Sequence, residues 1–157
     1  NAGQGQTEMS LLADLYGYLS GLTTITDEFG SPPRVYLQAA PTQGAYPYAT
    51  FSRIDVEHEH IMNQGAAGMA RAIIQFDVKD ENPVALVDAR EALRIAMDGY
   101  ADGVINGVGT TDVKLIELLD ERDSIIPPPR KDQRAVHTSA LDFELTYLET
   151  APTFPAT

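Results

Sequence analysis

The clearest pattern of apolar and polar positions lies in residues 68–79. Apolar side chains occupy every second position there, and charged or amide side chains occupy most positions between them, as in a strand with one buried and one wet face. The apolar positions are Ala72, Ile74, Phe76 and Val78. Residues 48–60, before the turn at 63–68, are rich in β-formers, but their apolar positions change face between Phe51 and Ile54. That change predicts a second strand that either contains a bulge or is apolar on both faces, and it leaves the register of the strand open.

A helix is predicted directly after the alternating strand. Asn82 is a favoured N-cap residue, Pro83 suits the first turn, and Gly99 suits the end of the helix. The apolar positions at helical spacing are Leu86, Ala89, Leu93, Ala96 and Met97. An earlier amphipathic helix is predicted for residues 7–22, and the threonine-rich run that follows is expected to end it.

The remaining segments complete the predicted fold. Residues 34–38, 113–119 and 135–149 are predicted strands, whereas the glycine-rich residues 99–109 and the three prolines at 127–129 predict loops. The order is α-β-β-β-α-β-β. Because helices do not alternate with every strand, we predict an α+β fold, a mostly antiparallel sheet of about five strands with two amphipathic helices packed on one face.

Composition narrows the classes of function. The chain has 157 residues and no cysteine, which excludes disulfides, thiolate zinc sites and cysteine nucleophiles. Its net charge of -12 argues against a nucleic-acid binder, because that class needs clustered Lys and Arg. No apolar run approaches the roughly 20 residues of a membrane helix, so we expect no membrane partner. We expect residues 1–8 to be a flexible arm, residues 9–150 a single domain and residues 151–157 an extended tail.

Two histidines form the most metal-like cluster in the sequence. His58 and His60 alternate with Glu57 and Glu59, and strict alternation would place both imidazoles on one side of a strand. A catalytic zinc site needs a third protein ligand, and the only other histidine, His137, is distant in sequence. The pattern therefore favours a solvated hairpin end, and we predict no metal and no cofactor.

The residue types of a hydrolase triad occur at His137, Ser139 and Asp142. On one strand His137 and Ser139 would lie about 6.5 Å apart, beyond the roughly 3 Å that a nucleophile and its base need. The glycines of residues 99–109 lack the Gly-Lys-Ser/Thr sequence of a phosphate-binding loop. We predict no catalytic residue.

Charged residues cluster at two further places. The first cluster, Asp120, Glu121, Arg122 and Asp123, sets three carboxylates around one guanidinium at the end of a predicted strand. A paired-carboxylate enzyme would need such groups in a cleft, and an exposed ionic turn or an intersubunit salt bridge is the favoured interpretation. The second cluster, Arg130, Lys131 and Arg134, is a basic loop that could meet an acidic surface of a neighbouring copy.

Several short strings stand in a recognisable order and spacing between residues 10 and 149. They are RVY (34–36), APTQG (40–44) before YPYATF (46–51), GAAGMARA (65–72) before IQFD (74–77), DAREALRIAMDG (88–99), LDERD (119–123) and VHTSALDF (136–143). In this arrangement the chain resembles the phage tail completion or tail terminator family. That family carries no active-site motif, so the resemblance transfers no catalytic residue.

The resemblance implies an α+β subunit that assembles into a homo-oligomeric ring, with a hexamer as the expected count. Such a ring would cap the tail tube protein, end its polymerisation, meet the head-completion or stopper protein, and let DNA pass without specific binding. It implies a virion protein at the head-tail junction that assembles in the host cytoplasm. Two alternatives stay open: a head-side connector or stopper subunit, and a small metal hydrolase that uses His58 and His60.

Three places are predicted to make assembly contacts. One is the polar turn of the first hairpin, with Asn63 and Gln64. The others are the charged run of residues 120–123 and the loop that carries Arg130 and Lys131. All three are polar and adjoin predicted strands, where loops usually provide partner contacts.

Overall fold

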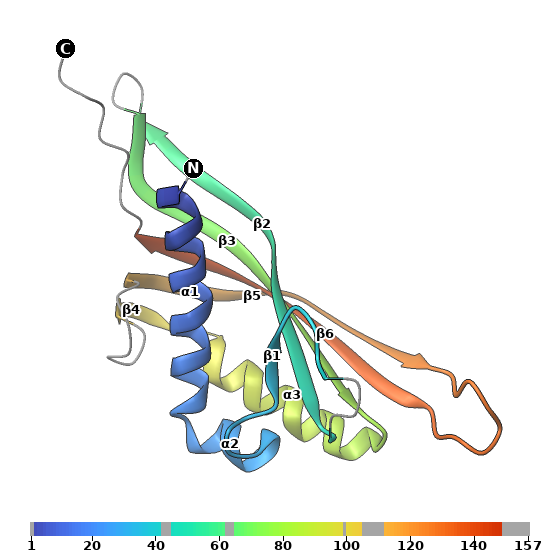
Figure 1. Ribbon diagram of the computed structural model, residues 1–157. Coiled ribbons are helices and arrows are strands. Elements are labelled where there is room, and N and C mark those ends of the chain that lie inside the picture. The colour runs from blue at the N-terminus through green and yellow to red at the C-terminus, as the bar shows by residue number, and fades with distance from the viewer. Residues whose placement is uncertain (1, 42–44, 62–64, 99, 105–111, 149–157) are drawn as a thin grey trace.

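The described residues form three helices and a long, twisted sheet (Figure 1). The computed structural model describes residues 2–41, 45–61, 65–98, 100–104 and 112–148, without the side chains of residues 2–10, 59–61, 65–67 and 101–104. The elements are α1 (Ala2–Ser20), α2 (Thr23–Phe29), β1 (Val35–Leu37), β2 (Tyr48–Ile61), β3 (Gly65–Asp80), α3 (Pro83–Met97), β4 (Ala101–Val104), β5 (Asp112–Ile126) and β6 (Val136–Leu148).

The strands form one six-stranded sheet in the order β1-β2-β3-β6-β5-β4. β1 runs parallel to β2, and every other neighbouring pair is antiparallel. The long hairpins β2–β3 and β5–β6 point in opposite directions away from the helices (Figure 1). The predicted α+β class with a mostly antiparallel sheet is confirmed.

The buried face of the sheet follows the alternation seen in the sequence. Its central residues are Ala72, Ile74, Phe76 and Val78 of β3 and Leu141, Phe143, Leu145 and Tyr147 of β6. The register places Ile74 opposite Phe143. The ring of Phe76 stacks on Phe51 at a centroid separation of 5.4 Å and meets Phe143 edge-on at 5.8 Å. The buried residues of all three helices belong to this same core, so the helices cover one face of the sheet.

α3 begins as its sequence predicts. The Asn82 side chain accepts hydrogen bonds from the two backbone N–H groups after Pro83, at 2.9 and 3.4 Å. The buried stripe consists of Leu86, Ala89, Leu93 and Met97. The helix ends at Met97, and the backbone N–H of Asp98 still bonds to the carbonyl of Arg94.

Tyr18 fastens α1 to α3. Its hydroxyl donates a hydrogen bond of 2.8 Å to the carbonyl of Ala96, and its ring meets Tyr100 edge-on at 5.7 Å. Burial, and then the neighbouring Tyr100, raise the pKa of Tyr18, so its hydroxyl keeps its proton as a donor. None of the described helices has the length and apolarity required to span a bilayer.

The helices correct two predictions. α1 begins at Ala2, so the first residues, predicted to be a flexible arm up to residue 8, are helical. The threonine-rich run does not end the helical region but starts α2. Ile25 and Phe29 lie one helical turn apart and are both fully buried, so packing outweighs the low helix propensity of threonine.

The observed strands contradict two further predictions. β4 lies inside the glycine-rich segment predicted to be a loop, because pairing with β5 satisfies its backbone groups. β5 runs to Ile126, beyond its predicted end at residue 119, and two register shifts between Val113 and Asp120 account for apolar residues on both of its faces. Of the two alternatives for β2, the structure has the bulge, because the register shifts just before Asp55.

Candidate assembly surfaces

Arg90 of α3 holds the β5–β6 hairpin against the helix. Its Nη1 lies 3.0 Å from both carboxylate oxygens of Asp123, and its Nε lies 2.9 Å from Oε1 of Glu121. Only 17% of the Arg90 side chain is exposed. Further along, the Asp98 carboxylate accepts a 3.2 Å hydrogen bond from the backbone N–H of Leu118. α3 therefore contacts β5 through polar groups from its middle to its C-terminal end.

Asp123 is the centre of this attachment. Ser139, which is fully buried on β6, donates its hydroxyl to Asp123 at 2.8 Å. That hydrogen bond, and then those from Arg90 and its positive charge, lower the pKa of Asp123 despite the opposing effect of its partial burial. The carboxylate is therefore ionised at neutral pH and links three elements, α3, β5 and β6.

Arg122 points to the opposite face of the sheet. Its Nη1 lies 3.0 Å from Oδ2 of Asp142 on β6 and also contacts Asp120. Of the two favoured interpretations of this charged run, the exposed ionic turn is wrong, and the intersubunit salt bridge stays a prediction. Residues 120–123 lie within β5, where successive side chains alternate, so Glu121 and Asp123 face Arg90 instead.

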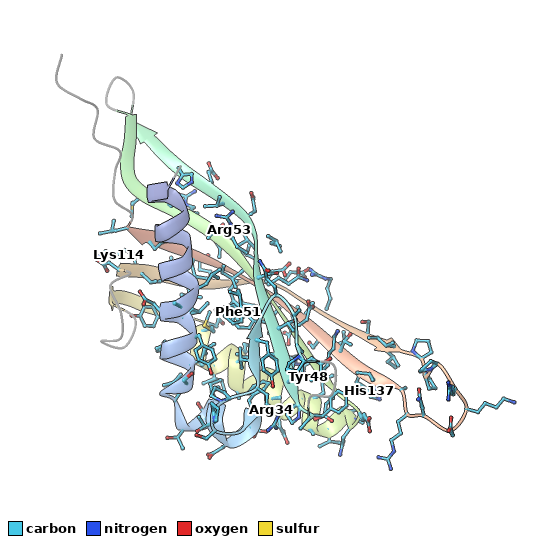
Figure 2. All side chains as sticks on the ribbon, viewed as in Figure 1. Arg34, Tyr48, Phe51, Arg53, Lys114 and His137 are labelled. Atoms are coloured by element: carbon cyan, nitrogen blue, oxygen red, sulfur yellow. The ribbon has the colours of Figure 1, made fainter. Side chains whose placement is uncertain are left out.

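A groove of about 440 Å³ opens between the start of α3 and the β5–β6 hairpin. Its walls include Pro83, Val87, Arg90, Ile125 and His137. Two of the apolar side chains that line it are exposed, Val87 at 42% and Ile125 at 60%. Figure 2 shows His137 where the hairpin leaves the body of the molecule.

The candidate triad is not assembled. Ser139 donates to Asp123 and not to His137, and the carboxylate of Asp142 is bound by Arg122 on the other face of the sheet. His137 lines the groove beside α3. The three side chains thus belong to separate interactions, as their spacing on one strand predicted.

Among the described residues, the outer edge of β5 is unpaired over much of its length. β4 pairs with β5 only as far as Leu115. Beyond that pairing, large apolar side chains are exposed: Leu119 at 48%, Ile125 at 60% and Ile126 at 46%. An exposed strand edge that carries apolar residues is a surface on which a further chain can dock.

The loop after β5 carries the basic cluster at the far end of the hairpin (Figure 1). Arg130, Lys131 and Arg134 are all exposed. A backbone hydrogen bond of 3.1 Å from Gln133 to Arg130 closes a turn in the loop. The predicted contacts Asn63 and Gln64 lie outside the described residues and stay predictions, as do the assembly roles of residues 120–123, Arg130 and Lys131.

A second groove, of about 290 Å³, runs between α2 and α3 and is acidic. Its lining consists of Thr24, Asp27, Glu28, Asp88, Glu91, Ala92 and Ile95. Glu91 is held by Arg94 at 2.8 Å, and that hydrogen bond is the main reason why its pKa is lowered. Ile95 is 67% exposed at the same place. This groove could not be predicted from the sequence, because one of its walls is α2, which was not predicted.

The histidine pair lies on β2, and only the side chain of His58 is described. The register of β2 shifts between His58 and His60, so the strict alternation assumed for them does not hold. Among the described side chains no group of three or more acidic or histidine residues is placed to hold a metal ion. The glycines at 99 and 105–111 lie outside the described residues.

Arg90 and Asp88 were not singled out from the sequence. Arg90 follows the buried Ala89 and so borders the apolar stripe of the helix, which is a signal for a basic side chain that can reach across to the sheet. Its partner Asp123 is 33 positions away, and no local pattern connects the two.

No family model and no curated protein matches the chain. Among solved structures, a chain from the "Virion of native gene transfer agent (GTA) particle" has a similar fold, with a TM-score of 0.67 and 18% sequence identity. The likeness covers 92% of this chain and 98% of that one.

Proposed function

We propose that this protein is a virion structural subunit that caps a phage-type tail tube. Copies form a ring, with a hexamer as the expected count, that ends polymerisation of the tail tube protein and meets a head-completion or stopper protein. The observation that carries this proposal is the shared fold with a chain of a phage-like virion particle over nearly the whole length of both chains. It agrees with the resemblance of several sequence strings to tail terminators.

The surfaces of the molecule support a role in assembly. A long β5–β6 hairpin ends in an exposed basic loop, β5 carries several exposed apolar side chains, and two grooves lie open on the subunit. Exposed apolar patches of this kind mark contacts with other proteins. The protein acts without catalysis in this proposal, and neither the triad residues nor the histidine pair has a chemical role.

The ring would surround the path of the DNA at the head-tail junction of the virion, after assembly in the host cytoplasm. With a net charge of -12 for each subunit, it would let the DNA slide without gripping its phosphates.

The test is assembly with a tail tube protein. The purified chain, alone and mixed with tail tube protein from the same particle, is studied by light scattering and negative-stain electron microscopy. We expect rings of defined mass, and tubes of limited length that carry a ring at one end. A chain that stays monomeric under all these conditions would refute the proposal.

The same images distinguish a tail terminator from the alternative, a head-side connector or stopper subunit. A connector or stopper subunit would bind the head-completion proteins and leave the length of the tubes unchanged. Tubes that grow without limit in the presence of a correctly formed ring would favour that alternative over a tail terminator.

A further inference from the structure

The basic loop is an exception in an acidic molecule. Against a net charge of -12, residues 127–135 contain Arg130, Lys131 and Arg134 with a single acidic residue, Asp132. All four side chains are exposed. Within the described part of the chain none of the three basic groups forms an ion pair.

The groove between α2 and α3 carries the opposite, negative charge. Asp27, Glu28 and Asp88 line it, and none of these carboxylates has an ion-pair partner among the residues that the structure describes. Glu91 adds a further negative group, which Arg94 partly balances. Ile95, 67% exposed, adds an apolar side chain to the lining of the groove beside its charges. A ligand for this groove therefore needs positive charge together with apolar surface.

The basic loop offers both positive charge and apolar surface. Its basic residues follow three consecutive prolines and the exposed Ile125 and Ile126. Proline restricts the backbone, so the loop loses less conformational freedom when it becomes ordered in a contact.

The loop cannot reach the groove of its own subunit. The β5–β6 hairpin carries the loop away from the helices, whereas α2 lies on the opposite side of the body from that loop (Figure 1). Loop and groove can therefore meet only between two copies. Such a contact joins two different surfaces, and a repeated contact of that type closes into a ring when its rotation allows closure.

We propose that the basic loop of one copy, with Arg130, Lys131 and Arg134, inserts into the acidic groove of the next copy, at Asp27, Glu28 and Asp88. This inference deepens the proposed function, because it names the contact that builds the ring. It also rests on observations that are independent of any tail protein. Each copy supplies one loop and one groove, so a closed ring leaves neither surface free.

Charge reversal tests the contact. We expect Arg130→Glu with Lys131→Glu, and separately Asp27→Lys with Asp88→Lys, each to weaken self-association in sedimentation velocity by roughly tenfold at low salt. A mixture of the two variants should associate again, because the loop of the first variant is acidic and the groove of the second is basic. A matched control is Asp55→Lys with Glu57→Lys on β2, which makes the same change in charge as the groove variant and should associate like the unmodified chain. Circular dichroism verifies that every variant is folded.

Cross-linking tests the pairing directly. Because the chain has no cysteine, the single variants Asp88→Cys and Lys131→Cys can form a disulfide with each other only between copies. We expect the mixed pair to give a cross-linked dimer under mild oxidation, and the double variant to give a ladder that ends at the number of subunits in the ring. Lys131→Cys mixed with Glu57→Cys is the control and should give little product.

The outcomes separate this contact from the proposed function. Rings that form normally with both reversed variants and give no cross-link would overturn the contact but leave the tail-capping role intact. Reversed variants that fail to associate even when mixed, although folded, would also overturn it. A chain that never associates, with or without tail tube protein, would overturn both.

Discussion

At the scale of single residues, Arg90 of α3 connects the helices to the β5–β6 hairpin. Replacement by methionine keeps the apolar stem of the side chain but removes the charge that faces Glu121 and Asp123. Because these carboxylates are partly solvated, we expect the free energy of unfolding in urea to fall by about 1 kcal/mol.

Arg94→Met is the matched control for that substitution. Arg94 bonds to Glu91 on the same helix and contacts no described residue of the sheet through an ion pair. Its replacement should therefore change stability less than that of Arg90. Equal losses for the two variants would show that Arg90 does not attach the hairpin.

The pKa of Asp123 gives the hairpin attachment a dependence on pH. The hydrogen bond from Ser139 and the pairing with Arg90 lower this pKa below that of the unfolded chain. The contribution to stability is therefore fully present above the unfolded value of about 4, and it is lost as the pH falls through the folded value. Urea unfolding at a series of pH values should show a steeper loss of stability below about pH 5 for the unmodified chain than for Asp123→Asn. Identical slopes would contradict this assignment.

α2 illustrates, at the level of elements, what the sequence could and could not predict. The strand alternation in β3 and β6 and the cap of α3 are local signals, and each predicted its element correctly. α2 and β4 carry no such signal. α2 is rich in threonine and is held by the packing of Ile25 and Phe29 in the core, whereas β4 contains Gly103 and is held by pairing with the next strand, β5. The acidic groove depends on α2 and could not be predicted without it.

Ile25→Ala tests whether packing creates α2. Ile25 is fully buried, so its truncation should lower the free energy of unfolding by about 2–5 kcal/mol, as for other large-to-small core substitutions. Thr24→Ala, an exposed neighbour on the same helix, should stay within about 0.5 kcal/mol of the unmodified chain. Thermal and urea unfolding give both values. A small loss for Ile25→Ala would show that α2 is not held by the core.

At the scale of the whole molecule, the β5–β6 hairpin carries the basic loop away from the helices (Figure 1), whereas α2 and α3 form the acidic groove. The sequence predicted that the basic loop could meet an acidic surface of a neighbouring copy, but it did not predict which surface. The basic side of the contact, with Arg130, Lys131 and Arg134, could be recognised in the sequence. The acidic side combines Asp27 with Asp88, which are distant in sequence and lie together only in the folded chain.

This pairing makes a prediction about DNA. In the assembled ring the basic loops are covered by acidic grooves, so the exposed basic cluster of each loop is not available to duplex DNA. We expect no binding in fluorescence anisotropy at about 0.1 M salt, where charges are screened beyond about 10 Å. The groove variant Asp27→Lys with Asp88→Lys leaves its loop uncovered and should bind DNA weakly, with an affinity that falls as salt rises. Asp55→Lys with Glu57→Lys carries the same net charge but still seats its loop, so it should bind less than the groove variant. Equal DNA binding by these two variants would show that net charge, and not the seating of the loop, keeps the ring from holding DNA.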